Sequence, residues 1–456
     1  MAGKPINADL PAAEAPAQAE VQRSRGTAAA EPKPSPPPKR RRRPVPAALK
    51  AIGGLVLVAL VFLLAAILGG GGANEGTSEG TSEPEPAPGP APEPATRADG
   101  PAQTPAAEAA AELGYPTFAT SNTTRVGGSD PAGIAAGVAL AVFPSATPTQ
   151  RPAAVTLVDE DDWQGAVAAA VLMAEPLRAP LLVTAGDELP EPTSQALDAL
   201  APQGSSATRR AQVFAVGGAA APADLRTTQI RAGSPAKLAV AIFALRDRLF
   251  GEPPAHIVLA PEAEPEFALP AAAWSARSGD PVLFTATEKL SKTTKKALKS
   301  HPEAPVFVLG PSSAISSRVV REAGNAGGKV RRVGGEDPVE NALALARYAS
   351  GSFGWNVNDP GHGFVVARSD APLEAAVAAP LSASGTWGPL LLSDDAVTLP
   401  PALRDYLLDV KPGYTSDPTR AFYNHVWIIG DQEAIDVTQQ AEINQLAELS
   451  KIGGEP

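Results

Sequence analysis

An apolar segment that begins with proline recurs three times in this chain and constrains its fold more than any other feature. The three copies are Pro180–Thr184, Pro281–Thr285 and Pro389–Ser393, and they begin 101 and 108 residues apart. A repeat of about 100 residues is large enough to bury a core of its own, whereas a solenoid repeat of roughly 20–40 residues is not. The sequence therefore predicts three related modules.

Each copy lies within the same order of predicted elements. A short strand and a glycine-rich turn open each module, and a serine or aspartate followed by proline then predicts the start of a helix. Short apolar runs alternate with helical stretches, which is typical of a parallel sheet covered by helices on both faces. We expect an α/β fold of three tandem small modules, each a mostly parallel sheet flanked by helices, with the recurring segment as a central strand. The modules are either separate beads or a pseudo-trimer.

Three segments of different composition precede the modules. Residues 1–46 have few large apolar side chains and are expected to form a disordered tail. Residues 47–70 contain the uncharged apolar run Ala51–Leu68, which predicts a transmembrane helix. Residues 71–112 are rich in Gly, Ser and Pro and predict an extended linker. The predicted modules occupy residues 113–227, 228–328 and 329–456.

The distribution of charge predicts the orientation of the membrane segment. The whole chain has a formal net charge of −11, yet the basic cluster Lys39–Arg43 lies just before the apolar run. Basic flanks stay on the cytoplasmic side, so we expect a single-pass protein of the cell membrane with a cytoplasmic N-terminus and extracytoplasmic modules. The apolar run exceeds the roughly 7–15 residues of a signal peptide, which favours an uncleaved anchor. Lipid or nucleic-acid binding is the alternative role of the cluster, although we expect no nucleic-acid partner.

Composition and motifs argue against an enzyme. No cysteine is present, which excludes disulfides, thiolate metal sites and cysteine nucleophiles. The sequence lacks a Gly-x-Ser-x-Gly elbow, a His-Glu-x-x-His motif and a Walker loop. His256 and His425 lie at the edges of predicted strands and are interpreted as packing residues rather than bases.

The glycine-rich openings are the candidate binding sites. In each of them an arginine lies close to the N-terminus of a predicted helix, where backbone N–H groups attract a phosphate or carboxylate. The structural alternative is that the glycines form a tight turn and the arginine pairs with an acid of a neighbouring module. The candidate residues are Arg125, Gly127, Gly128, Arg231, Gly233, Arg332, Gly334 and Gly335.

An acidic run, Asp159–Trp163, is a second candidate. Asp159, Asp161 and Asp162 offer oxygen ligands to a divalent cation such as Ca²⁺, which would bridge an acidic module to an anionic polymer. Trp163 offers a flat face to a sugar. The alternative is a solvated loop at the end of a strand. No other cofactor is expected.

These motifs resemble the cell-wall-binding repeat type 2 family of Gram-positive surface proteins. The first module carries Arg125–Gly128, Ala179–Thr184 and Val216–Gly218, and the third carries Arg332–Gly335 and Gly388–Leu392. The second module is more diverged, and the resemblance covers about residues 115–440. It implies a triplet that packs as a pseudo-trimer and attaches proteins non-covalently to anionic wall polymers.

The chain departs from the family pattern at the first helix, where Ser129–Gly133 lacks the usual Arg and Tyr. We expect a non-catalytic, membrane-anchored surface protein whose extracytoplasmic repeats bind an anionic cell-wall polymer or a peptidoglycan-associated glycan. Two alternatives stay open: an extracytoplasmic enzyme or modifier that acts on envelope glycans, and a protein–protein scaffold with degenerate repeats.

Overall fold

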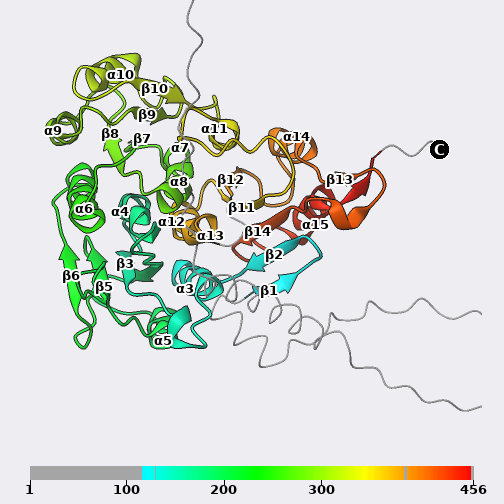
Figure 1. Cartoon of the computed structure of the whole chain (residues 1–456), viewed down its shortest axis with the longest axis horizontal. Helices are drawn as coiled ribbons and strands as arrows, with labels where there is room; N and C mark the ends of the chain where they lie inside the picture. Colours follow the sequence, from blue (N-terminus) through cyan, green and yellow to red (C-terminus); the bar gives the residue numbers. More distant parts are fainter. Residues whose placement is uncertain (1–115, 129, 385–387, 453–456) are drawn as a thin grey trace, which may run out of the picture. The chain divides into compact units, whose positions relative to one another are not determined.

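The computed structural model describes residues 116–128, 130–384 and 388–452, which belong to one unit, Thr96–Pro456 (Figure 1). The predicted tail, membrane helix and linker, at 1–46, 47–70 and 71–112, lie outside these residues. No helix within the described ranges is long and apolar enough to cross a membrane.

Within the described residues, the strands form three larger sheets and one two-stranded sheet. In chain order they are β1 Pro116–Ala119, β2 Thr123–Val126, β3 Val155–Asp159, β4 Leu181–Thr184, β5 Val213–Val216, β6 Thr227–Ile230, β7 Ile257–Pro261, β8 Val282–Thr285, β9 Val306–Leu309, β10 Val330–Val333, β11 Gly363–Arg368, β12 Leu390–Ser393, β13 Gly413–Tyr414, β14 His425–Ile429 and β15 Ser450–Lys451. The strand orders are β4-β3-β5-β6 in the first repeat, β8-β7-β9-β10 in the second and β12-β11-β14-β2-β1 in the third, while β13 pairs with β15. Among these described strands every pair is parallel except β1–β2, which confirms the predicted α/β fold with mostly parallel sheets.

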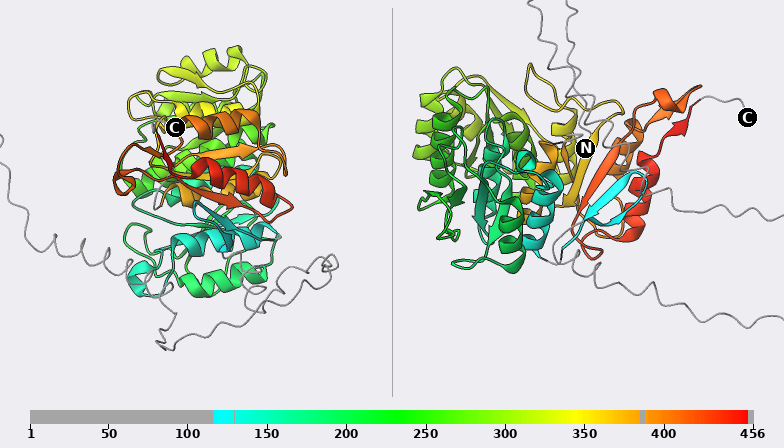
Figure 2. Two further views of the ribbon diagram at one scale, coloured as in Figure 1. Left: turned by 90° about the vertical axis from the view of Figure 1, so that its right-hand side faces the viewer. Right: turned by 60° about the horizontal axis from the view of Figure 1, so that its bottom comes forward.

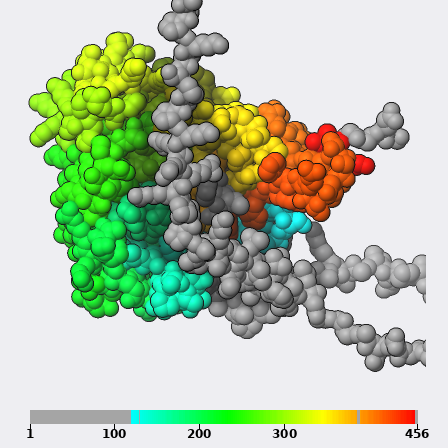
Figure 3. Space-filling model, viewed as in Figure 1, coloured from blue at the N-terminus to red at the C-terminus, as the bar shows by residue number. Residues whose placement is uncertain are grey.

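The opening strands of the repeats exchange sheets in a cycle. The strand that opens the second predicted module, β6, completes the sheet of the first repeat, and β10 likewise completes the sheet of the second. The first opening strand, β2, pairs with β14 and so completes the sheet of the third repeat. Figure 2 shows this cyan hairpin, β1–β2, beside the orange strands of the third repeat, and in Figure 3 the cyan surface adjoins the orange surface of that repeat. Each sheet therefore contains the opening strand of the next repeat in the cycle, and the third sheet also contains β1.

The helices cover both faces of the sheets. They are α3 Pro131–Val142, α4 Trp163–Ala169, α5 Glu191–Leu200, α6 Pro235–Phe250, α7 Pro265–Ala268, α8 Pro270–Ser278, α9 Lys292–Ser300, α10 Ser317–Gly324, α11 Pro338–Arg347, α12 Pro372–Val377, α13 Ala379–Ser382, α14 Pro401–Asp409 and α15 Val437–Ala447, with 3-10 turns η1 Pro148–Gln150, η2 Ala170–Met173 and η3 Pro418–Arg420. The predicted helix starts are confirmed, because Asp130, Ser234 and Asp337 cap α3, α6 and α11 ahead of a proline.

The recurring apolar segments form β4, β8 and β12, and all three strands are buried along their length. The expectation that they are central strands is wrong, because each lies at one edge of its sheet. They are nevertheless apolar throughout because a helix of their own repeat packs on them: α3 on β4, α6 on β8 and α11 on β12.

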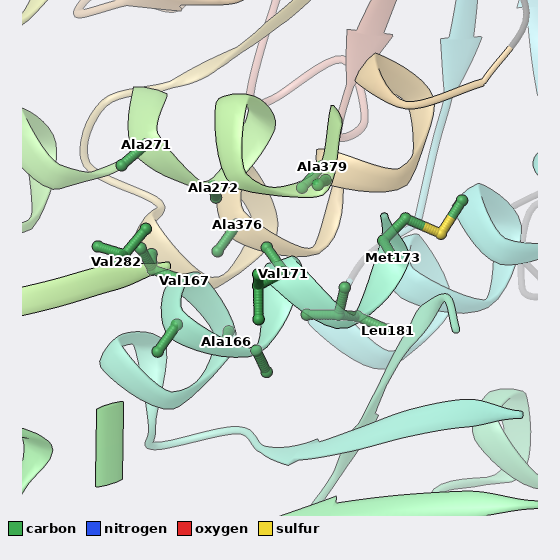
Figure 4. Packing of buried hydrophobic residues seen from close by; sticks show 14 of the residues in the cluster. Ala166, Val167, Val171, Met173, Leu181, Ala271, Ala272, Val282, Ala376 and Ala379 are labelled. Carbon is green, nitrogen blue, oxygen red and sulfur yellow. The ribbon is translucent and has the colours of Figure 1, made fainter. Parts of the chain in front are cut away.

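Short helices rich in alanine join the three repeats at the centre. The pairs α4–α12, α8–η2 and α8–α13 are in contact, and Figure 4 shows Ala166, Ala271, Ala272, Ala376 and Ala379 facing this region. Because alanine side chains are small, the helices approach one another closely and leave little space between them. One continuous apolar core contains side chains of all three repeats, which favours the pseudo-trimer over separate beads.

Candidate functional site

Arg125, the arginine of the first glycine-rich opening, is buried between β2 and the end of the third repeat. Its side chain is 1 % exposed. Its Nε and one terminal nitrogen donate to Gln440 Oε1 at 3.0 and 2.7 Å. The terminal nitrogens also donate to the carbonyl oxygens of Gly430, Asp431 and Ile435 at 2.9, 2.5 and 2.6 Å. All five N–H groups of the guanidinium are used within the protein, so none is available to an external anion.

The charge of Arg125 persists in this environment. Burial lowers the pKa of Arg125 to about 10, and the negative charge of Asp431 opposes that shift. The guanidinium is therefore protonated near neutral pH and makes charge-assisted hydrogen bonds to the carbonyl oxygens.

Arg332 has the same role one repeat earlier. It lies on β10 and donates to the carbonyl oxygens of Gly310 and Pro311 at 2.5 and 2.8 Å, and to that of Ile315. Burial lowers the pKa of Arg332 as well, although its side chain is only partly buried. Both arginines thus attach an opening strand to the preceding repeat in the cycle through backbone oxygens, and Arg125 also through the amide oxygen of Gln440. The acidic side chain that the structural alternative expects is not the acceptor.

Arg231 is not the counterpart of these two arginines. In the strand register, Arg125 lies opposite Ile428 and Arg332 lies opposite Val308. Each of these partners is two residues before the glycine that follows its strand. In β6 that position belongs to Gln229, whose amide donates to the carbonyl oxygen of Gly217 at 3.4 Å. Arg231 lies two residues further on and is exposed to solvent.

Most of the candidate glycines are required by close backbone packing. A Cβ atom at Gly128 or Gly335 would lie 2.9 or 2.4 Å from the backbone of the helix that follows. At Gly334 it would lie 2.9 Å from the backbone at the end of β9. Gly127 is buried, whereas Gly233 is exposed and has nothing within 4 Å of its Cβ position. Backbone packing therefore explains the glycines at positions 128, 334 and 335, in line with the structural alternative.

The cavity beside the first opening is acidic. It has a volume of about 200 Å³, and its charged lining residues are Asp130, Glu374, Asp431, Glu433 and Arg368. The arginine is paired with Asp370 through bonds of 2.9 and 2.8 Å, and this pairing lowers the pKa of that aspartate. The net negative charge disfavours an anionic polymer at this opening.

Two carboxylates of the acidic run accept hydrogen bonds from the backbone. Asp159 accepts from the N–H groups of Asp161 and Gly186, each at 3.1 Å, and Asp162 caps α4 by accepting from Gly165 at 2.7 Å. Burial raises the pKa of Asp162. In the part of the chain that the structure describes, no three carboxylates or histidines are arranged to hold a metal ion. Asp159, Asp161 and Asp162 are therefore not assembled as a cation site.

Trp163 is also occupied within the fold. Its ring packs edge-on against Phe284 with 5.8 Å between ring centroids, at the boundary of the shared core. This contact between the first and second repeats explains the tryptophan without a bound sugar.

A different cavity, which the sequence patterns did not indicate, lies between the second and third repeats. It has a volume of about 450 Å³ and is called here the His256 cavity. Its lining residues are Ala255, His256, Trp274, Arg277, Ser278, Asp280, Ser352, Gly354, Trp355, Val357 and His362. Two indole rings, two imidazoles, a guanidinium and a carboxylate thus converge on one hollow, which is the usual composition of a small-molecule site.

Asp280 organises the polar side of this cavity although only 1 % of it is exposed. Its Oδ1 accepts from the backbone N–H of His256 at 2.9 Å, and its Oδ2 accepts from Trp274 Nε1 at 2.9 Å. The same Oδ2 lies 3.0 Å from Nδ1 of His256. Because a carboxylate oxygen accepts, this contact assigns the ring hydrogen to Nδ1 and leaves Nε2 as an acceptor.

Aromatic rings fix the remaining walls. The His256 ring lies edge-on to Phe307 and Phe353, with centroids 5.5 and 5.4 Å away. Trp274 and Trp355 meet edge-to-face at 5.5 Å. The interpretation of His256 as a packing residue is thus incomplete, because the same ring also joins a polar network. The feature of the sequence that could have indicated this network is Asp280, a charged residue that directly precedes an otherwise apolar strand segment.

Comparisons with known proteins indicate the fold. No family model and no curated protein sequence matches this chain. Its structure is similar to that of Cwp6 from Clostridium difficile, with a TM-score of 0.58, 17% identity and coverage of 72% of this chain and 48% of that one. Cwp8 from the same organism gives a TM-score of 0.54, 18% identity and coverage of 72% and 52%. The chain spans about half the length of both proteins. The likeness is one of fold alone.

Proposed function

We propose that this chain is a membrane-anchored surface protein whose three repeats associate with the cell wall by binding a saccharide unit of a wall polymer in the His256 cavity. The anchor is the predicted helix at residues 47–70, with the repeats on the extracytoplasmic side. The fold similarity to the cell wall proteins Cwp6 and Cwp8 supports the location. The observation that carries the binding proposal is the convergence of two indole rings and several polar groups on one cavity.

The chemistry of the cavity suits a sugar that carries a charge. Indole faces pack against the apolar face of a pyranose ring, while buried polar groups fix its orientation. Trp355 is only partly buried, so its ring is accessible from the hollow. Arg277 adds a guanidinium to the lining, and His362, whose Nε2 lies 3.2 Å from Asp359 Oδ1, adds an imidazole. The charge of the guanidinium offsets the acidic character of the chain for a phosphate or carboxylate on the polymer.

Sedimentation of purified residues 96–456 with isolated cell walls tests this function. We expect the protein to co-sediment, and to do so less when the anionic polymers have been stripped from the walls. Trp355→Ala should weaken the association by about tenfold, because it removes one wall of the site without touching the sheets. Tyr423→Ala is the matched control, since Tyr423 is 57% exposed and lies outside the cavity.

The outcomes separate the alternatives. Absence of sedimentation would exclude wall association and would favour a scaffold function. A scaffold function is supported by the large apolar side chains that are exposed in the described part of the chain, all of which lie in the third repeat: Val397, Leu408, Phe422, Tyr423, Val437 and Ile452. Sedimentation that is unaffected by Trp355→Ala would show that the polymer binds elsewhere.

A further inference from the structure

We propose that Ser352, His256 and Asp280 form a proton relay that makes Ser352 a nucleophile toward carboxylic esters. Ser352 Oγ lies 3.4 Å from His256 Nε2, and His256 Nδ1 lies 3.0 Å from Asp280 Oδ2. These are the contacts of a nucleophile, a base and the carboxylate that orients the base. The activity goes beyond wall association and does not depend on it.

The base is held in one orientation. The hydrogen bond from Nδ1 to Asp280 fixes the tautomer and leaves the lone pair of Nε2 facing Ser352. The T-shaped contacts with Phe307 and Phe353 restrict rotation of the ring. Asp280 is itself fixed by Trp274 Nε1, so it is a positioning residue rather than a catalytic one. A positioned base of this kind contributes about 10²–10⁴-fold to proton transfer.

The nucleophile is presented on a tight turn. Ser352 is exposed and lies between Gly351 and Gly354, which adopt φ values of +63° and +100°. Backbone bonds of 2.8 and 3.1 Å between Ser350 and Phe353 close the turn. The hydroxyl is thereby accessible from the His256 cavity, while its base is buried behind it. A separation of 3.4 Å is long for this contact, and such contacts commonly shorten when a substrate binds.

The reaction is acyl transfer. Ser352 Oγ attacks the carbonyl carbon of the ester while its proton passes to His256 Nε2. The carbon–oxygen bond to the alcohol then breaks, and the alcohol leaves with the proton from Nε2. Water, activated by the same nitrogen, releases the acid and restores the serine. The relay moves protons but does not itself stabilise an oxyanion, so the expected substrates are esters, whose leaving groups are good, rather than amides.

Labelling with a fluorophosphonate probe tests the relay in the full-length protein. The serine oxygen bonds to phosphorus, fluoride leaves and the proton passes to the histidine, so the label reports the same activation. We expect one adduct at Ser352, located by peptide mass spectrometry, and none in Ser352→Ala. His256→Gln should slow labelling by at least tenfold, whereas Ser350→Ala, in the same turn, should label within twofold of the parent protein.

Asp280→Asn distinguishes positioning from damage to the fold. We expect the maximal rate of labelling by the probe to fall, because the base loses its orientation. The probe concentration that gives half of the maximal rate should stay within twofold, because the cavity is intact. The proposal is overturned if Ser352 carries no adduct, or if labelling proceeds at the same rate in His256→Gln. Wall sedimentation and probe labelling of the parent protein are measured separately, so the failure of one proposal is distinguished from the failure of the other.

Discussion

Replacement of Arg125 by alanine removes five hydrogen bonds that attach β2 to the end of the third repeat. Four oxygen atoms lose this donor: the amide oxygen of Gln440 and the carbonyl oxygens of Gly430 and Ile435, which are buried, and that of Asp431, which is partly buried and still accepts from Ile435. Each buried group left without a partner costs about 1–3 kcal/mol, and water that enters the space of the deleted side chain recovers part of this cost. We therefore expect the free energy of unfolding to fall by about 3–5 kcal/mol, the range found when one member of a buried charged network is removed.

Urea unfolding of residues 96–456, followed by far-ultraviolet circular dichroism, measures this loss. Arg332→Ala should cost less, about 1–3 kcal/mol, because Arg332 donates to three carbonyl oxygens and is only partly buried. Arg231→Ala is the control and should change stability by less than about 0.5 kcal/mol, since Arg231 is exposed. Equal effects of the three substitutions, or loss of wall association in Arg125→Ala without loss of stability, would refute the structural role.

Two further predictions concern local packing. Asp162→Ala should lower the free energy of unfolding by about 1 kcal/mol, because the cap of α4 is lost. Asp162→Asn should be neutral or slightly stabilising at pH 7, because burial raises the pKa of Asp162 and so disfavours its charged form. As the pH falls through that raised pKa, Asp162 becomes protonated in the folded protein, so the difference in free energy of unfolding between Asp162→Asn and the parent protein should disappear. Urea unfolding at several pH values measures this difference. An Asp162→Asn protein as unstable as Asp162→Ala would contradict the prediction. Gly335→Ala should destabilise by about 1–3 kcal/mol, because its Cβ would lie 2.4 Å from the Glu340 backbone, and Gly233→Ala should stay within about 0.5 kcal/mol in the same assay.

The sequence predicted the strands and helix starts well because both depend on local residue patterns. The apolar segment Leu181–Thr184 and its two counterparts are strands, and Asp337 caps a helix before a proline. The sequence did not predict the sheet to which β2, β6 and β10 belong. A strand pattern specifies which faces are apolar, but it does not specify the neighbour on either edge, and here that neighbour lies in another repeat.

The role of the arginines could not be read from the sequence for a related reason. An arginine before two glycines is compatible with an anion site and with capping of carbonyl oxygens, and only the position of the acceptors decides between them. For Arg125 the acceptors lie more than 300 residues away along the chain. The His256 network was hidden in the same way, because Asp280 and Ser352 follow His256 by 24 and 96 residues and belong to no short motif.

The cyclic exchange of strands gives a physical reason why the three repeats form one unit. If β2 completed the sheet of its own repeat, the third sheet would end at β14 with an unpaired edge, and such edges promote association with other chains. The first opening strand instead covers that edge, and Arg125 attaches it there through the five hydrogen bonds. The same arrangement places β1, the first described strand, at the border of the third repeat. A pull on the chain before Pro116 would therefore act first on β1 and β2, and the buried guanidinium of Arg125 would resist their separation from β14.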